Sequence, residues 1–328
     1  MREDLLFAFN AVGPIIFTVA IGYILKRIGL IGPDLAKAAH KLVFRAFLPI
    51  LLFVNILGIE DFSNIRLGYV LYSVIGIALL FAVGLPIVLA FTKKREHRGV
   101  MLQAVFRSNY AFVGIPLATS LGGAEGALIA TLLSVVLVPT INIFSVIALS
   151  LFSDTGRVSV KKILVGIAKN PLIVGISAGI VYLILREALA AAGIFIDITE
   201  SGAIWGTLKN LSNLATPLAL VMLGAQFEFS AISALKREII FSTLAKCLVA
   251  PILGIGIAAI AFRDNFLAAE YASIVAVFAT PVSISSVPMS QEMGADSSLA
   301  GQIVVFTTIF SALTIFTASF VLKTLGIF

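Results

Sequence analysis

Long apolar stretches separated by short, charged connections run through the whole sequence. A stretch of about 20 apolar residues is enough to cross a lipid bilayer as a helix. Ten stretches reach this scale, and no low-complexity segment or soluble domain lies between them. The pattern therefore predicts an all-α polytopic membrane protein with ten transmembrane helices. The predicted spans are Phe9–Leu25, Lys41–Leu57, Leu67–Phe91, Val100–Leu121, Glu125–Phe152, Ile163–Leu185, Leu208–Phe227, Ile239–Phe262, Tyr271–Met293 and Leu299–Leu322.

The fourth predicted span, Val100–Leu121, is interrupted by polar and helix-breaking residues. It carries Arg107 and Asn109, followed by Gly114 and Pro116. A proline in a membrane helix frees backbone carbonyls, which need partners in protein or in a water-filled cavity. Polar residues at such depth mark substrate or ion pathways. We therefore expect half of a discontinuous helix here, broken at Gly114 and Pro116, at a substrate site.

The second half of the chain contains a matching span. A gapless comparison pairs Pro116 with Pro288 and Gly122 with Gly294. The ninth span has a second proline, Pro281. Five spans per half is an odd number, so the two halves enter the membrane in opposite senses. Two broken spans at equivalent places in inverted repeats are the sequence signature of a transporter binding site.

Composition supports a membrane location. The chain is 60% hydrophobic and 12% charged, whereas an ordinary soluble domain is about 25% charged. The single cysteine, Cys247, excludes an intramolecular disulfide. Two histidines without a His/Cys cluster give no support for a metal site, and nothing in the sequence calls for a cofactor.

The net charge of +6 reflects membrane orientation rather than nucleic-acid binding. If the predicted spans are numbered as helices 1 to 10 in chain order, thirteen lysines and arginines fall in the loops that join helices 1–2, 3–4, 5–6, 7–8 and 9–10. Six fall on the opposite side. The positive-inside rule places the richer side in the cytoplasm. Both termini are therefore expected outside the cytoplasm, in a protein of the inner or plasma membrane.

The runs RSNYAFVGIPLA and ATPVSISSVP, together with the five-plus-five layout, resemble the auxin efflux carrier family. This family comprises prokaryotic relatives of the plant PIN transporters, within the inverted-repeat superfamily of bile-acid and auxin-type carriers. The resemblance implies one repeat in residues 1–153 with helices 1–5, and a second in residues 161–328 with helices 6–10. It also implies crossing broken helices 4 and 9.

The resemblance further implies two groups of helices. Helices 1, 2, 6 and 7 would form a scaffold capable of homodimerisation, and helices 3–5 and 8–10 a transport domain that moves as an elevator. The implied cargo is a small organic anion, either auxin-like or a mono- or dicarboxylate such as malate or malonate. Two features depart from the family: the cytoplasmic loop Ser153–Lys161 is short, and helix 9 has no Asn around its first break.

The candidate substrate-binding residues come from the two broken spans. Arg107 can hold a carboxylate bidentately and Asn109 can hydrogen-bond to it. An alternative reading is that Arg107 and Lys246 extend to the lipid headgroups. Polar residues in other helices, such as Asn142 and Gln302, have the alternative role of interhelical hydrogen-bond partners, which are common inside helix bundles. The binding set is Arg107, Asn109, Gly114, Pro116, Pro281, Ser283, Ser286, Pro288 and Gln291, with Asn142, Lys246 and Gln302 as supporting residues.

The charge distribution indicates how such a carrier would work. No carboxylate falls in the middle of a predicted span, although ion-coupled carriers commonly place one there. We therefore predict a uniporter or exchanger that mediates efflux. A sodium- or proton-coupled symporter of the bile-acid type and a passive channel are alternatives. An enzyme is not expected, because the hydrolase and metalloprotease motifs are absent.

Overall fold

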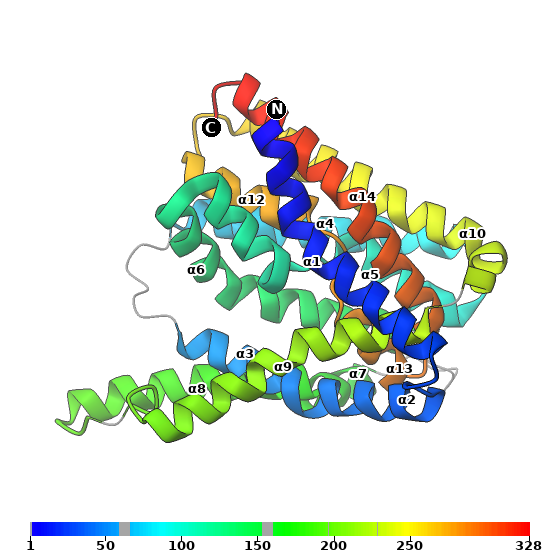
Figure 1. Cartoon of the computed structure of the whole chain (residues 1–328). Coiled ribbons are helices and arrows are strands. Elements are labelled where there is room, and N and C mark those ends of the chain that lie inside the picture. Colours follow the sequence, from blue (N-terminus) through cyan, green and yellow to red (C-terminus); the bar gives the residue numbers. More distant parts are fainter. Residues whose placement is uncertain (1, 59–65, 153–159, 196, 228) are drawn as a thin grey trace.

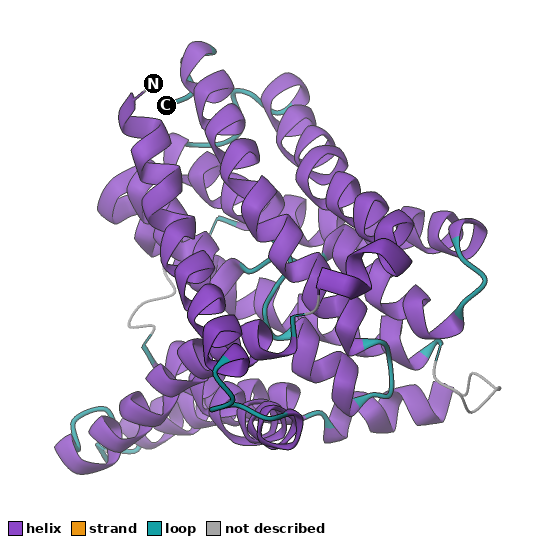
Figure 2. Cartoon of the chain, turned by 45° about the vertical axis from the view of Figure 1, so that its right-hand side comes forward, coloured by secondary structure: helices purple, strands orange, loops and turns teal. Residues whose placement is uncertain are grey.

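The computed structural model describes residues 2–58, 66–152, 160–195, 197–227 and 229–328, and these residues form helices joined by short connections (Figures 1 and 2). The described residues contain no strand. The helical elements of the first half are α1 (Arg2–Arg27), α2 (Pro33–Leu42), η1 (Val43–Phe47), α3 (Leu48–Leu57), α4 (Leu67–Phe91), α5 (Arg95–Phe106), η2 (Tyr110–Gly114) and α6 (Ile115–Ser150). Those of the second half are α7 (Val160–Lys169), α8 (Pro171–Ala191), α9 (Gly202–Gln226), α10 (Phe229–Leu244), η3 (Ala245–Val249), η4 (Ile252–Gly256), α11 (Ile257–Ala261), α12 (Ala268–Ala279), α13 (Ser286–Glu292) and α14 (Ser297–Thr324).

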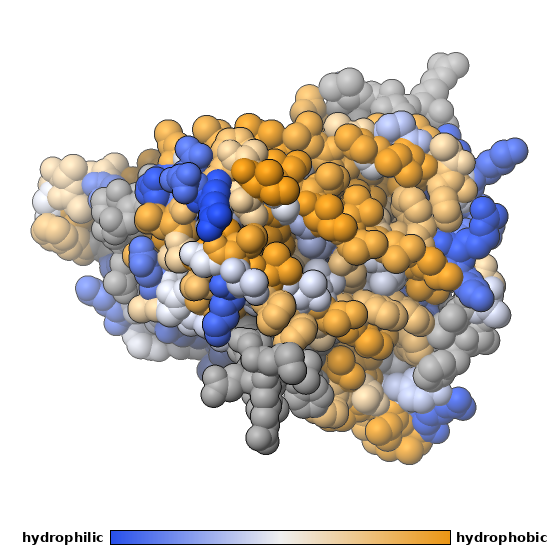
Figure 3. Space-filling view, turned by 90° about the horizontal axis from the view of Figure 1, so that it is seen from above, coloured by the Kyte–Doolittle hydropathy of each residue, from blue (hydrophilic) through white to orange (hydrophobic). Residues whose placement is uncertain are grey.

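Six helical stretches in the described residues are long and apolar enough to cross a membrane. Apolar side chains cover much of the face seen in Figure 3, and hydrophilic side chains gather in a few clusters. The chain is therefore a multi-pass membrane protein by its helices as well as by its composition. The six stretches are Pro33–Leu57, Leu67–Phe91, Arg95–Ser150, Pro171–Ala191, Ser233–Ala261 and Ser297–Thr324.

One group of helices packs in close pairs. Helix α1 lies along α9, and α3 lies along α8, whose far end projects beyond the other helices together with the start of α9 (Figure 1). Glycines permit both approaches: a Cβ atom on Gly224 would collide with the carbonyl of Val19, and one on Gly175 with that of Pro49. Small residues at such interfaces let helix backbones come close in a membrane.

A second group surrounds the buried helix α12. Helix α12 packs against α6, while α5 packs against α4 and α6, and α14 contacts α10 and α13. Every residue from Ala269 to Ala279 is buried. A helix that is apolar on all sides is typical of such a central position. This group contains both of the spans that the sequence predicts to be broken.

The helical path within this group is interrupted inside each of the two spans that the sequence predicts to be broken. Helix α5 ends at Phe106, and residues 107–109 are not helical before η2 begins. Helix α12 ends at Ala279, and residues 280–285 are not helical before α13 begins. The first interruption precedes the predicted position: Gly114 ends η2, and Pro116 lies in the first turn of α6. Residues 110–150 are helical without a gap, so the π-helical turn η2 directly before Pro116 is a local adjustment that accommodates a proline within a membrane helix.

Two further elements differ from the predicted spans. Ile163–Leu185 is not one helix, because Asn170 has an extended backbone and its side chain caps α8 by accepting a hydrogen bond from the Leu172 N–H. Conversely, α6 joins two predicted spans, with a sharp bend at Gly123 (φ 62°). The expected short loop Ser153–Lys161 falls largely on residues 153–159, which lie outside the described residues.

Candidate functional site

The two interruptions meet each other inside the protein. The backbone N–H of Asn109 donates a hydrogen bond of 2.8 Å to the carbonyl oxygen of Pro281. Asn109 also starts the next helical turn, because its own carbonyl accepts from the N–H groups of Val113 and Gly114. Residues more than 170 positions apart in the sequence are thereby joined by one backbone hydrogen bond. Such contacts satisfy the backbone groups that an interrupted membrane helix leaves free.

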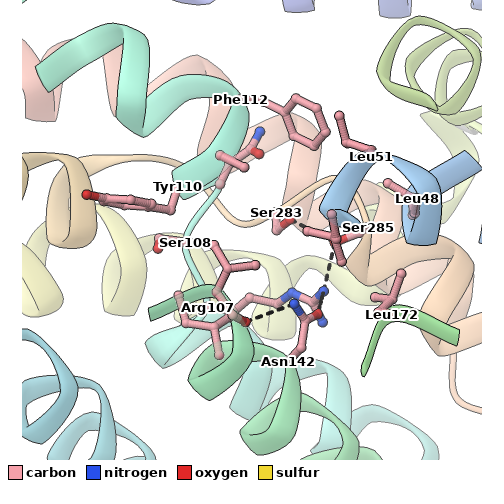
Figure 4. Close-up of a pocket in the computed structure, with 15 residues that line it drawn as sticks. Leu48, Leu51, Arg107, Ser108, Tyr110, Phe112, Asn142, Leu172, Ser283 and Ser285 are labelled. Atoms are coloured by element: carbon pink, nitrogen blue, oxygen red, sulfur yellow. Dashed lines mark hydrogen bonds between the residues drawn. The ribbon is translucent and has the colours of Figure 1, made fainter. Parts of the chain in front are cut away.

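Arg107 lies at this meeting point and is fully buried, with 1% of its surface exposed. Its Nη2 donates to Ser285 Oγ at 2.7 Å and to Asn142 Oδ1 at 3.2 Å. Nη1 donates to Gln103 Oε1 and contacts Met289 Sδ at 3.0 Å. Figure 4 shows the guanidinium pointing toward Asn142 and Ser285. Arg107 therefore does not extend to the lipid headgroups.

The guanidinium is held by neutral groups only. Within the described part of the chain, no carboxylate lies within ion-pair distance of Arg107, and its Nε has no hydrogen-bond partner. A buried charge is costly unless an opposite charge or a full set of hydrogen bonds compensates it. The arrangement leaves Arg107 able to pair with an anion.

The side chain of Asn109 is buried, and its amide makes no hydrogen bond to any residue that the structure describes. Neither Oδ1 nor Nδ2 has a partner among the described residues, and the same holds for Ser108 Oγ. Buried polar groups in folded proteins are nearly always hydrogen-bonded, so an orphan amide needs an explanation. Asn109 and Ser108 both line a cavity, which supplies one.

This cavity is small and has two unlike sides. Its volume is about 40 Å³, enough for about three water molecules at roughly 10–15 Å³ each. Its polar side comes from the two interruptions and from Asn142. Its apolar side comes from both helix groups, with Leu48 and Leu51 of α3 and Leu172 of α8 facing Phe112 of η2 (Figure 4). The cavity thus lies between the two helix groups.

A second, larger hollow of about 730 Å³ shares the lining residue Ala111 with the first. Its walls include Asn55, Arg186, Asp197 and Lys209. Arg186 Nη1 is 3.1 Å from Asp197 Oδ2, so these two charges balance. Lys209 is exposed and lies over the Trp205 ring. The larger hollow therefore has charged and polar walls and adjoins the small cavity at Ala111.

The structure brings part of the predicted site together. Arg107, Asn109, Asn142 and Ser283 all line the small cavity. The other predicted residues do not line it. Pro281 lies in the second interruption and Pro116 lines the larger hollow, while Lys246 is buried in η3 rather than extended to the headgroups. The remaining residues off the cavity are Gly114, Ser286, Pro288, Gln291 and Gln302.

Several residues of the site were not predicted from the sequence. Ser285 is next to two predicted serines, and only its contact with Arg107 distinguishes it. Gln103 could have been found, because it lies one helical turn before Arg107 on the same face. The apolar wall at Leu48, Leu51 and Leu172 carries no local signal, since leucines are frequent in every span.

The chain matches a model of a known protein family. A family model described as a membrane transport protein matches residues 7–163 and 155–318, which together make up most of the chain. No curated protein matches the chain.

Proposed function

Because the chain belongs to the auxin efflux carrier family of membrane transport proteins, we propose that it is a secondary transporter of small organic anions. The cargo would be an auxin-like compound or a mono- or dicarboxylate such as malate or malonate. One observation carries the proposal: an orphan amide on Asn109 shares a cavity with Arg107, whose charge has no carboxylate partner among the described residues.

The proposed architecture is an inverted repeat of two five-helix units, residues 1–153 and 161–328. The order of elements supports it. Helices α5 and α12 each have 12 residues and end at an interruption. Each interruption is followed by a further helical segment and then by a glycine with positive φ, Gly123 at 62° and Gly294 at 74°. In this proposal, the interrupted segments are the crossing broken helices of ten transmembrane helices.

The site would recognise the head group of an anion. Arg107 would balance its charge, while the Asn109 amide and Ser108 hydroxyl would hydrogen-bond to its oxygens. Ser283 donates to or accepts from Ser285 at 2.9 Å and would hold that side chain in place. Charge-assisted hydrogen bonds of this kind are about twice as strong as neutral ones. The scaffold leucines would contact the rest of the cargo.

Movement between the two helix groups would give access to the cavity, which at about 40 Å³ admits little more than water. We propose that α1, α2, α3, α8 and α9 form a scaffold, and that the group around α12 moves past it as an elevator. The positive-inside rule puts both termini and the larger hollow on the extracytoplasmic side. Export of an anion along the membrane potential then needs no coupled ion, since 100 mV supplies about 2.3 kcal/mol per charge.

A thermal-shift screen of the purified protein against a panel of carboxylates tests the proposal. A ligand present at about 100 times its dissociation constant stabilises a protein by about 2.7 kcal/mol. We expect at least one carboxylate to raise the melting temperature, and the substitution Asn109→Ala to abolish that shift without lowering the melting temperature of the ligand-free protein.

The matched control is Asn213→Ala, the same change at an exposed position on α9. It should keep the full shift. A carboxylate that stabilises Asn109→Ala as much as the unmodified protein would remove the binding site from this cavity.

The cavity also bears on energy coupling. No residue that lines it is a carboxylate, the group that commonly holds a coupling cation in ion-driven carriers. We therefore expect transport in proteoliposomes to continue at an unchanged rate when sodium is replaced by choline. Loss of transport on that replacement would instead indicate a sodium-coupled symporter of the bile-acid type.

A further inference from the structure

His97 is a buried titratable side chain outside the proposed transport site. It is the third residue of α5, and its ring lies between acidic groups of other helices. Nδ1 is 3.2 Å from Glu238 Oε1 on α10, and Nε2 is 3.2 Å from Asp296 Oδ2 at the N-cap of α14. Glu96, its neighbour on α5, has Oε1 at 3.8 Å from Nε2.

This geometry fits a ring that carries a proton on both nitrogens. An ionised carboxylate only accepts hydrogen bonds, and a neutral imidazole has a single N–H. Burial acts to raise the pKa of the Asp296 carboxyl, but hydrogen bonds from His97 and the Leu299 N–H outweigh burial and lower it. Asp296 is thus an anion. Lys94, just before α5, contributes the opposing positive charge that faces the ring.

The corresponding position in the second half has a different anchor. Glu270 is the third residue of α12 and is buried; its Oε2 lies 2.9 Å from Nη1 of Arg66, the N-cap of α4, and accepts from the Leu267 N–H. The N-terminal ends of α5 and α12 are therefore each held by residues from the other half of the chain. Arginine stays charged at any physiological pH, whereas histidine changes charge between about pH 5 and 8.

Helix α5 connects His97 to the transport site. The helix is continuous to Phe106, so ten residues at about 1.5 Å each place Arg107 roughly 15 Å from His97 along the helix axis. A backbone hydrogen bond also ties the Asp296 N–H to the Glu96 carbonyl at 3.3 Å. We propose that His97 is a positioning residue whose doubly protonated ring fixes the N-terminal end of α5. It thereby holds Arg107 and Asn109 at the point where the two interruptions meet. This inference rests on the proposed transport site and adds proton-dependent control to it.

Hydrogen exchange of the full-length protein in detergent, without cargo, tests the anchor. Exchange is measured at pH about 6, where a histidine is mostly protonated, and at pH about 9, where it is neutral, and is corrected for the intrinsic effect of pH. We expect peptides from α5 and from residues 107–110 to exchange about tenfold faster at the higher pH, the effect of losing one charge-assisted hydrogen bond. Exchange of the Asn109 N–H directly measures how often the contact between the two interruptions opens, because this N–H donates to the Pro281 carbonyl. Peptides from α12 should not change.

Two variants separate His97 from other causes. In His97→Gln the side chain stays neutral, so exchange of α5 should be fast at both pH values. His40→Gln removes the only other histidine of the sequence and should behave like the unmodified protein. The proposal is overturned if α5 exchanges equally at both pH values, if α12 changes as much as α5, or if His40→Gln removes the pH dependence. Since no cargo is added, the result is independent of the carboxylate screen.

Discussion

Arg107 shows how a single buried side chain organises the site. Its planar guanidinium reaches Gln103, Asn142 and Ser285 at once, and lysine cannot reproduce this fork although it keeps the charge. We expect Arg107→Lys to leave at least one buried acceptor unpaired, at a cost of about 1–3 kcal/mol. The melting temperature of the purified protein should fall accordingly.

Arg27→Lys provides the control for this change, because Arg27 is exposed at the end of α1. Its melting temperature should stay close to that of the unmodified protein. Equal losses in the two variants would show that the contacts of Arg107 contribute no more than those of a surface arginine.

The sequence reveals the polar residues of the candidate site more readily than it reveals the residues that surround them. Arg107 and Asn109 are conspicuous because polar residues inside an apolar span need a reason. The partners of Arg107 are less visible, since Ser285 lies 178 residues away in the sequence and is joined to it only by the fold. Apolar walls such as Leu172 have no polar character that would distinguish them. Local pattern thus reveals groups that are costly to bury, but not which distant groups compensate them.

Close helix pairs depend on glycine at particular positions. A Cβ atom at Gly224 of α9 would overlap the Val19 carbonyl of α1, whereas a Cβ at Gly206 on the same helix meets no atom within 4 Å. We expect Gly224→Ala to lower the melting temperature by forcing α1 and α9 apart, a strain of about 1–3 kcal/mol. Gly206→Ala should raise it slightly, by the roughly 1 kcal/mol of helix propensity that alanine gains over glycine. Similar melting temperatures for the two variants would contradict this account of the α1–α9 contact.

At the scale of whole elements, uniform apolar stretches are predictable and interruptions are not. Leu67–Phe91 forms α4 with the predicted bounds. The break at residues 107–109 lies at least about two turns before the proline that suggested it, because the π-helical turn η2 accommodates Pro116. The cap at Asn170 does have a local signal, because Asn followed by proline at the first helical position is typical of a helix start, but apolar residues on both sides favour one continuous span. Proline and glycine signal that a helix changes course, while tertiary contacts determine where it does so.

At the scale of the whole molecule, the ion pair between Arg45 and Glu292 joins the proposed scaffold to the proposed transport domain. Arg45 of η1 donates from Nη2 and Nε to Glu292 Oε2, the last residue of α13, at 2.7 and 3.1 Å. We expect a bifunctional thiol cross-linker between cysteines at these two positions, in a Cys247→Ser background, to stop transport in proteoliposomes. An elevator requires the two groups to slide past each other, and the tether prevents this.

The control cross-link joins cysteines at Arg186 and Asp197, which face each other within the proposed scaffold. Transport should continue when this pair is linked. A carrier linked between positions 45 and 292 that still transports at full rate would show that these groups do not move relative to one another.

The unpaired charge of Arg107 has a consequence for the transport cycle. In the proposed elevator without cargo, the moving helices would carry a guanidinium that no described carboxylate balances, and moving it through a low-dielectric environment would raise the barrier. A bound anion reduces the net charge, so the loaded domain crosses more readily than the bare one. The return of the empty domain would then be the slow step of the cycle. Unlabelled anion on the opposite side of the membrane should therefore accelerate the counterflow of labelled anion.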